Sequence, residues 1–102
     1  MNNIKNPIAN RNLTCLLNGH QEQVHVTLGM PYADLDAFVC EYEIVIGETM
    51  NTHKIMGIDG IQALQLALFM VGSTLGSLPG ASEWKWNDVP NTGFPTDFRP
   101  LP

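Results

Sequence analysis

The sequence contains few basic residues, and those it has are dispersed along the chain. Five Lys and Arg residues stand against ten Asp and Glu residues in 102 positions, which gives a formal net charge of −5. Nucleic-acid binding depends on clustered Lys and Arg side chains that contact phosphates. The composition therefore argues against a nucleic-acid partner.

Long hydrophobic runs are also absent. The most apolar stretch, 61–71, includes Gln62 and Gln65 and is shorter than the roughly 18 residues that a membrane-spanning helix requires. The N-terminal segment contains no apolar region of the kind found in secretory signals. We therefore expect a cytoplasmic protein with no membrane partner, in which Cys15 and Cys40 are reduced thiols within the core.

The motifs of common active sites are missing as well. His20, His25 and His53 are the only histidines; no two of them have the spacing of a zinc-binding helix, and no Cys-x-x-Cys pair is present. Ser73 falls inside a predicted helix rather than in the strand–turn–helix elbow of a serine hydrolase. We therefore predict no catalytic residue, no metal and no cofactor, and a protein that is not an enzyme.

The sequence does contain one well-marked helix. Asp59 is a suitable N-cap residue, and Gln62, three positions later, can reach back to complete a capping box. The helix should begin near Gly60 and end at 75–77. Gly76 is the expected left-handed stop at its C-terminus.

The surface of this helix is largely apolar. Only Gln62 and Gln65 are polar within 61–71, which predicts a helix buried on most of its circumference. Phe69 continues the stripe that these glutamines begin. We expect Phe69 to contact Phe94, so that the C-terminal segment is anchored on the helix.

Most residues before the helix alternate between apolar and polar, which is the pattern of β-strands. The dipeptide Asn18-Gly19 indicates a hairpin turn, although the polar residues that follow leave open a longer turn. Trp84-Lys85-Trp86 is either a fifth strand or an edge extension. The four main predicted strands cover 13–17, 24–28, 37–46 and 49–56.

These elements predict one α+β domain spanning 1–102. Its core is an antiparallel sheet of four to five strands with one long helix packed across one face. Residues 1–10 are expected to form a loose arm and 31–36 a loop. An extended, Pro-rich C-terminal strap is expected at 88–102, because proline sustains neither helix nor sheet.

Acidic residues concentrate in the middle of the chain, in a stretch without Lys or Arg. Glu41 and Glu43 lie on the polar side of the predicted strand 37–46, and this side should face water. Each acid alone is an ordinary surface residue, but together they form a candidate site for a basic protein partner. The candidate partner-binding residues are Asp34, Asp36, Glu41, Glu43 and Glu48.

The second half of the chain resembles a family of small bacterial proteins. That family has a G-x-D-x-x-Q-A-L-x-L-A-L helix, a Trp-bearing segment and a terminal G-F-P, which correspond here to 57–68, 84–86 and 93–95. Its members are similar in size and organisation to immunity proteins of contact-dependent and polymorphic toxin systems. The resemblance implies a non-enzymatic cytoplasmic protein that neutralises a cognate toxin, such as a nuclease with a basic groove, by covering its active site.

Two other functions remain open. A pocket between helix and sheet, lined by Tyr42, His53 and Trp84, would make the protein a small-ligand-binding or enzymatic domain. A homodimer joined along an edge strand or the tryptophan face would make assembly its main property. A reproducible rise in melting temperature with one small molecule would favour the first of these.

Overall fold

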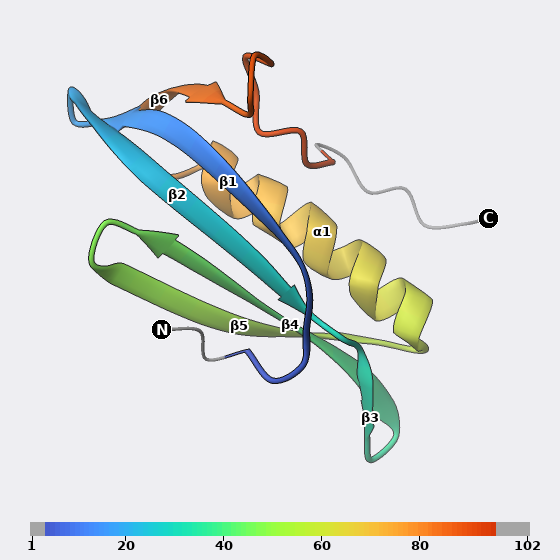
Figure 1. Ribbon diagram of the computed structural model, residues 1–102. Coiled ribbons are helices and arrows are strands. Elements are labelled where there is room, and N and C mark those ends of the chain that lie inside the picture. Colours follow the sequence, from blue (N-terminus) through green and yellow to red (C-terminus); the bar gives the residue numbers. More distant parts are fainter. Residues whose placement is uncertain (1–3, 96–102) are drawn as a thin grey trace.

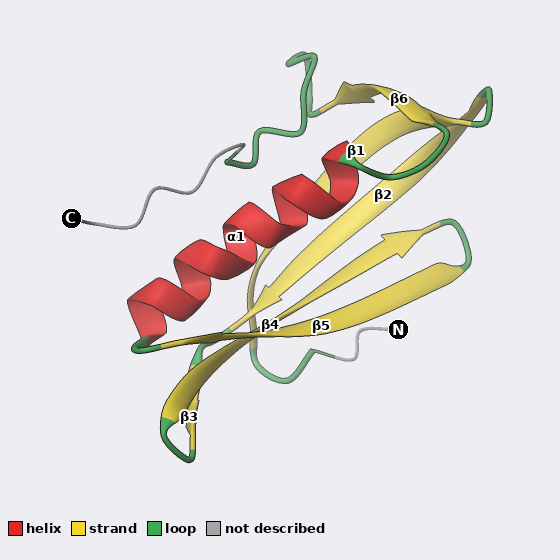
Figure 2. Ribbon diagram, turned by 180° about the vertical axis from the view of Figure 1, so that it is seen from behind, coloured by secondary structure: helices red, strands yellow, loops and turns green. Residues whose placement is uncertain are grey.

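A computed structural model describes residues 4–95 of the chain (Figure 1). One helix lies across one face of an antiparallel sheet, which confirms the predicted α+β architecture (Figure 2). Within the described range the sheet has six strands rather than the expected four to five. In chain order the elements are β1 (Pro7–Leu17), β2 (His20–Gly29), β3 (Tyr32–Asp34), β4 (Ala37–Ile46), β5 (Thr49–Gly57), α1 (Gly60–Gly76) and β6 (Ala81–Lys85).

The strand that the sequence did not predict is β3, which falls in the expected loop 31–36. β4 pairs with β5 along one edge, and its other edge is shared by β2 and β3. β3 has only three residues, all exposed, and it follows Pro31. So short an exposed strand needs no apolar alternation, and that is why the sequence pattern did not reveal it.

The turn between β1 and β2 confirms the hairpin predicted from Asn18-Gly19. Leu17 pairs with His20, so the turn has two residues, and both have positive φ, 53° for Asn18 and 85° for Gly19. Positive φ at both central residues defines the turn type that matches the twist of the flanking strands. The alternative of a longer turn is wrong.

The start of α1 is capped as predicted. The Asp59 carboxylate accepts a hydrogen bond from the Gln62 amide at 2.8 Å. The Gln62 side chain accepts one from the Ile58 N–H at 2.7 Å, one residue before the N-cap. At the other end, Gly76 belongs to the helix and does not have positive φ, so the predicted left-handed stop is wrong.

Gly76→Ala is therefore expected to stabilise the protein. A Cβ at this position would meet no atom within 4 Å. Alanine restricts the unfolded chain and favours helix, so the free energy of unfolding should rise by about 0.5–1 kcal/mol, measured by urea denaturation. Gly57→Ala is the opposite control, because its Cβ would lie 2.5 Å from the Ala63 nitrogen. A loss of stability in Gly76→Ala would contradict this reading of the helix end.

The buried face of α1 is narrower than the sequence predicts. Ile61 is 67% exposed and Met70 is 37% exposed, so burial on most of the circumference is wrong. α1 runs closest to β4 and β5. The small side chains of Ala63 and Ala67 permit this approach. The buried stripe consists of Ala63, Ala67, Val71 and Leu75.

The C-terminal segment covers some of the sheet that α1 leaves open. Trp84 and Trp86 pack against the core formed by the sheet and α1, and Phe94 is buried in it. The strap is described as far as Pro95, and its remainder, 96–102, lies outside the described residues. The predicted contact between Phe69 and Phe94 stays a prediction.

The N-terminal segment lies on the opposite face of the sheet. Ile4 is buried, and its Cγ2 occupies the space beside Gly29 where a side chain would otherwise stand. The Asn6 carbonyl accepts the Met30 N–H at 2.9 Å. The predicted loose arm 1–10 is therefore wrong from Ile4 onward, because these residues seal the sheet and then enter β1; residues 1–3 lie outside the described range.

Candidate functional site

The acidic residues predicted to bind a partner do not form one patch. Asp34 and Asp36 lie at the turn between β3 and β4, whereas Glu48 lies at the turn between β4 and β5 (Figure 1). The ten residues of β4 separate these turns, a distance of roughly 30 Å by strand geometry. The acids at these two turns therefore do not share one compact patch.

Glu43 is buried, so its predicted exposure to water is wrong. Glu43 is only 2% exposed. The Thr52 hydroxyl donates a hydrogen bond to its carboxylate at 3.4 Å. The alternation of β4 correctly places Glu43 on the face away from α1. That face is itself partly covered, because Thr27 and Val39 are also buried there.

The Glu41 carboxylate is engaged by side chains of two neighbouring strands. The Tyr32 hydroxyl donates to its carboxylate at 2.8 Å, and the Lys54 ammonium lies 3.8 Å from the same oxygen. The hydrogen bond to Glu41 raises the pKa of Tyr32. The side chain of Glu41 is only 14% exposed. Neither Glu41 nor Glu43 is thus a freely accessible carboxylate.

The turn between β3 and β4 carries the most exposed large apolar residue that the structure describes. Leu35 is 98% exposed and has a φ of +56°. Its neighbours Asp34 and Asp36 are also exposed. The left-handed conformation costs a leucine roughly 1–2 kcal/mol, whereas glycine adopts it freely. A strained and exposed leucine contributes little to folding, so it is a candidate contact residue.

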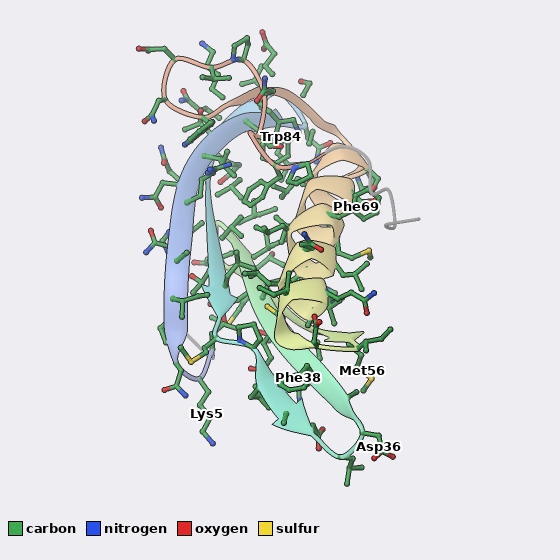
Figure 3. The ribbon with its side chains drawn as sticks, turned by 90° about the vertical axis from the view of Figure 1, so that its right-hand side faces the viewer. Lys5, Asp36, Phe38, Met56, Phe69 and Trp84 are labelled. Atoms are coloured by element: carbon green, nitrogen blue, oxygen red, sulfur yellow. The ribbon has the colours of Figure 1, made fainter. Side chains whose placement is uncertain are left out.

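More exposed apolar residues gather beside this turn. Phe38 in β4 pairs with Ala33 on one side and with Gly57 on the other, which brings the end of β5 next to the turn (Figure 3). Ile58 is 82% exposed, Ile61 67% and Met56 64%. We call this region the β3–β4 end surface; it comprises Asp34, Leu35, Asp36, Met56, Ile58, Asp59 and Ile61.

The pocket expected from Tyr42, His53 and Trp84 takes a different form. The Tyr42 and His53 rings stack on each other at 5.0 Å, and Trp84 packs against the core. A pocket does lie between helix and sheet, but other residues line it, among them Arg11 and Leu68. Across residues 4–95, no group of three or more His, Cys, Asp or Glu side chains could hold a metal.

Both cysteines are free, buried thiols, as predicted. Burial raises the pKa of Cys15, and the nearby Glu22 carboxylate adds to this effect. Burial likewise raises the pKa of Cys40, with a smaller contribution from Glu41. A thiol reacts as the thiolate, so neither side chain is suited to act as a nucleophile near neutral pH.

The raised thiol pKa values predict a loss of stability in alkali. Below the ordinary thiol pKa of about 8.5 both folded and unfolded states hold the proton, and the contribution to stability is fully present. As the pH rises further, the unfolded thiols ionise first, so the melting temperature should fall. The double variant Cys15→Ala and Cys40→Ala should show a shallower fall between about pH 8.5 and pH 10. If the melting temperature of this variant fell with pH as steeply as that of the parent, the raised thiol pKa values would not be the cause.

Comparison with known proteins identifies one family. The profile of a family described as a domain of unknown function (DUF6968) matches residues 9–96. No curated protein and no solved structure matches the chain. In the part of the chain that the structure describes, no helix is long and apolar enough to cross a membrane.

Proposed function

The chain belongs to the DUF6968 family, and we propose that it is a non-enzymatic binding protein, an immunity protein that covers the active site of a cognate bacterial toxin. The observation that carries this proposal is Leu35, held with positive φ at a turn and 98% exposed. Glycine or asparagine would suit this position better for folding. A leucine there is explained by a contact with a partner.

The residues around Leu35 indicate what such a partner surface would contain. Ile58 and Ile61 offer exposed apolar area, and exposed apolar groups rimmed by polar ones mark protein interaction sites. Asp34 and Asp36 place two carboxylates at the edge of this area. We therefore propose a partner with an apolar depression bordered by Lys or Arg, as in the active-site groove of a nuclease.

This proposal narrows the contact set predicted from the sequence. Asp34 and Asp36 stay in the proposed site, and the β3–β4 end surface adds apolar residues to them. Glu43 is excluded by its burial, and Glu41 is engaged by Tyr32 and Lys54. Glu48 lies at the other end of β4 and becomes a control position. The cytoplasmic location and the resemblance to immunity proteins are part of the proposal.

The proposal is tested with Leu35→Gly. Glycine relieves the positive φ, so the free energy of unfolding should stay the same or rise by up to about 1 kcal/mol, measured by urea denaturation. It should nevertheless weaken binding to a cognate toxin domain, sought among the proteins encoded by neighbouring genes, by about 10-fold or more, since central apolar anchors dominate interface energies. Binding is measured by biolayer interferometry, together with protection of cells that express the toxin.

Charge reversal tests the electrostatic part of the same proposal. Asp34→Lys with Asp36→Lys should slow association, and the difference from the parent should shrink as salt rises. Glu48→Lys, which changes charge by the same amount per site at the other end of β4, should leave association close to that of the parent. Equal effects at both ends, or unchanged affinity in Leu35→Gly, would overturn the proposed surface. The proposal would also be overturned if this protein formed a stable homodimer through the surface around Leu35.

A further inference from the structure

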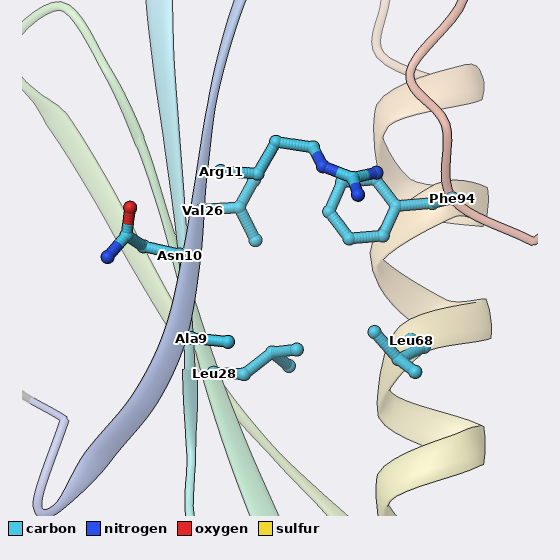
Figure 4. A pocket seen from close by; sticks show the side chains of 7 residues that line it. All are labelled: Ala9, Asn10, Arg11, Val26, Leu28, Leu68 and Phe94. Carbon is cyan, nitrogen blue, oxygen red and sulfur yellow. The ribbon is translucent and has the colours of Figure 1, made fainter. Parts of the chain in front are cut away.

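An apolar pocket lies between α1 and the strands β1 and β2 (Figure 4). Its volume is about 120 Å³. We propose that this pocket binds a small monocarboxylate with an apolar body of about six carbons, an activity beyond the proposed toxin binding. The side chains that face the pocket are Ala9, Arg11, Val26, Leu28, Leu68 and Phe94.

The pocket exists because α1 is set to one side of the sheet. α1 runs closest to β4 and β5, so a space remains over the middle of β1 and β2. Phe94 fills one part of that space and Leu68 borders another (Figure 4). β6 pairs with β1 only from Thr14 to Leu17, so no described strand covers the edge of β1 beside Ala9 and Arg11. This edge offers a route into the pocket.

Among the residues that the structure describes, Arg11 is the only charged side chain that lines the pocket. Its guanidinium lies 3.8 Å from the Trp86 ring centroid and 4.7 Å from the Phe94 ring centroid. Its Nη1 donates to the Thr92 carbonyl at 3.1 Å. The two rings pack against the guanidinium group, and the Thr92 carbonyl fixes one of its N–H donors. None of the carboxylates within residues 4–95 forms an ion pair with it.

This arrangement leaves donors of Arg11 available for an anion. A guanidinium has five N–H donors, and Arg11 uses one of them on the Thr92 carbonyl. Aromatic stacking restricts the plane of the group without occupying the donors in that plane. A carboxylate matches the geometry of such a planar fork and can accept two parallel hydrogen bonds. The preferred charged group of the ligand is thus a carboxylate.

The walls and the volume define the rest of the ligand. Leu28, Val26 and Leu68 present only hydrocarbon, so the body of the ligand must be apolar. A cavity of about 150 Å³ lined by similar side chains holds benzene in another protein. The pocket here is slightly smaller and has an open side. Benzoate and hexanoate are therefore the appropriate probes, whereas a long fatty acid would extend beyond the pocket.

The proposal is tested by titrating the protein with benzoate and with benzyl alcohol, its neutral analogue, while amide and side-chain NMR signals are followed. Benzoate is expected to shift the signals of Ala9, Arg11 and Leu68 and to bind about 10-fold or more tightly than benzyl alcohol. In Arg11→Met, which retains an unbranched apolar side chain, benzoate affinity should fall to that of the alcohol. Lys85→Met removes a cation outside the pocket and should leave the preference unchanged.

A second variant keeps the test decisive if Arg11→Met folds poorly. Leu68→Trp fills the pocket while retaining Arg11, and it should abolish binding of both probes. Three results would overturn the proposal: equal affinity for benzoate and benzyl alcohol in the parent protein, shifts confined to residues away from the pocket, or undiminished benzoate binding in Leu68→Trp.

Discussion

Replacing Glu43 by lysine is expected to lower the free energy of unfolding by about 3–5 kcal/mol, enough to unfold much of a marginally stable domain. Glu43 is 2% exposed and accepts a hydrogen bond from the Thr52 hydroxyl. Lysine would place a positive charge in the same closed space and remove the acceptor. A buried charge without compensating partners costs several kcal/mol, because water no longer solvates it.

The effect is measured by urea denaturation monitored by circular dichroism. Glu43→Gln keeps the shape and an acceptor oxygen, so it should cost clearly less than Glu43→Lys. Asp36→Lys reverses a charge at an exposed turn and should change stability by no more than about 0.5 kcal/mol. If Glu43→Lys has the same denaturation midpoint as Asp36→Lys, the carboxylate is not buried in solution and belongs again among the candidate contact residues.

Phe94→Ala is expected to have an effect of similar size, about 3–5 kcal/mol. Phe94 is 8% exposed and belongs to the core, although it comes from a segment without regular secondary structure. Its Cβ lies 3.1 Å from the position that a Cβ on Gly72 would take, so the segment rests directly against α1. Alanine would leave a cavity and remove one of the two rings that stack on Arg11.

Denaturation in urea measures this loss, with tryptophan fluorescence as a second signal because Trp86 also contacts Arg11. Val89→Ala is the matched control from the same segment. Val89 is 38% exposed, so its truncation should cost less than about 1 kcal/mol. A small effect of Phe94→Ala, equal to that of Val89→Ala, would show that the segment does not contribute to the core.

The candidate surface was predicted from the sequence only in part. Asp34 and Asp36 were identified from the density of acids, and the structure places them at an exposed turn. Leu35 lies between them and was not singled out, because neither periodicity nor composition reveals a positive φ. A single apolar residue between two Asp residues, a type common in turns, is the sequence signal that could have identified it.

Local sequence determined most of the elements of this protein, although not β3 or the start of β1. Asp59 and Gln62 mark the start of the helix, Asn18-Gly19 fixes the first hairpin, and the alternation in 37–46 assigns each residue to a face of the sheet. Each of these signals depends on residues a few positions apart, whose interactions are already decided by backbone geometry.

Only the tertiary structure decided which faces are covered and which charges are buried. Ile4 closes over Gly29, and Arg11 reaches the Thr92 carbonyl 81 positions later in the chain. Such contacts depend on how strands and the C-terminal segment are assembled in space, and no short sequence pattern records them. For this reason the sequence predicted the correct face of the sheet for Glu43 but wrongly predicted that it is exposed to water. It did not predict the pocket lined by Arg11.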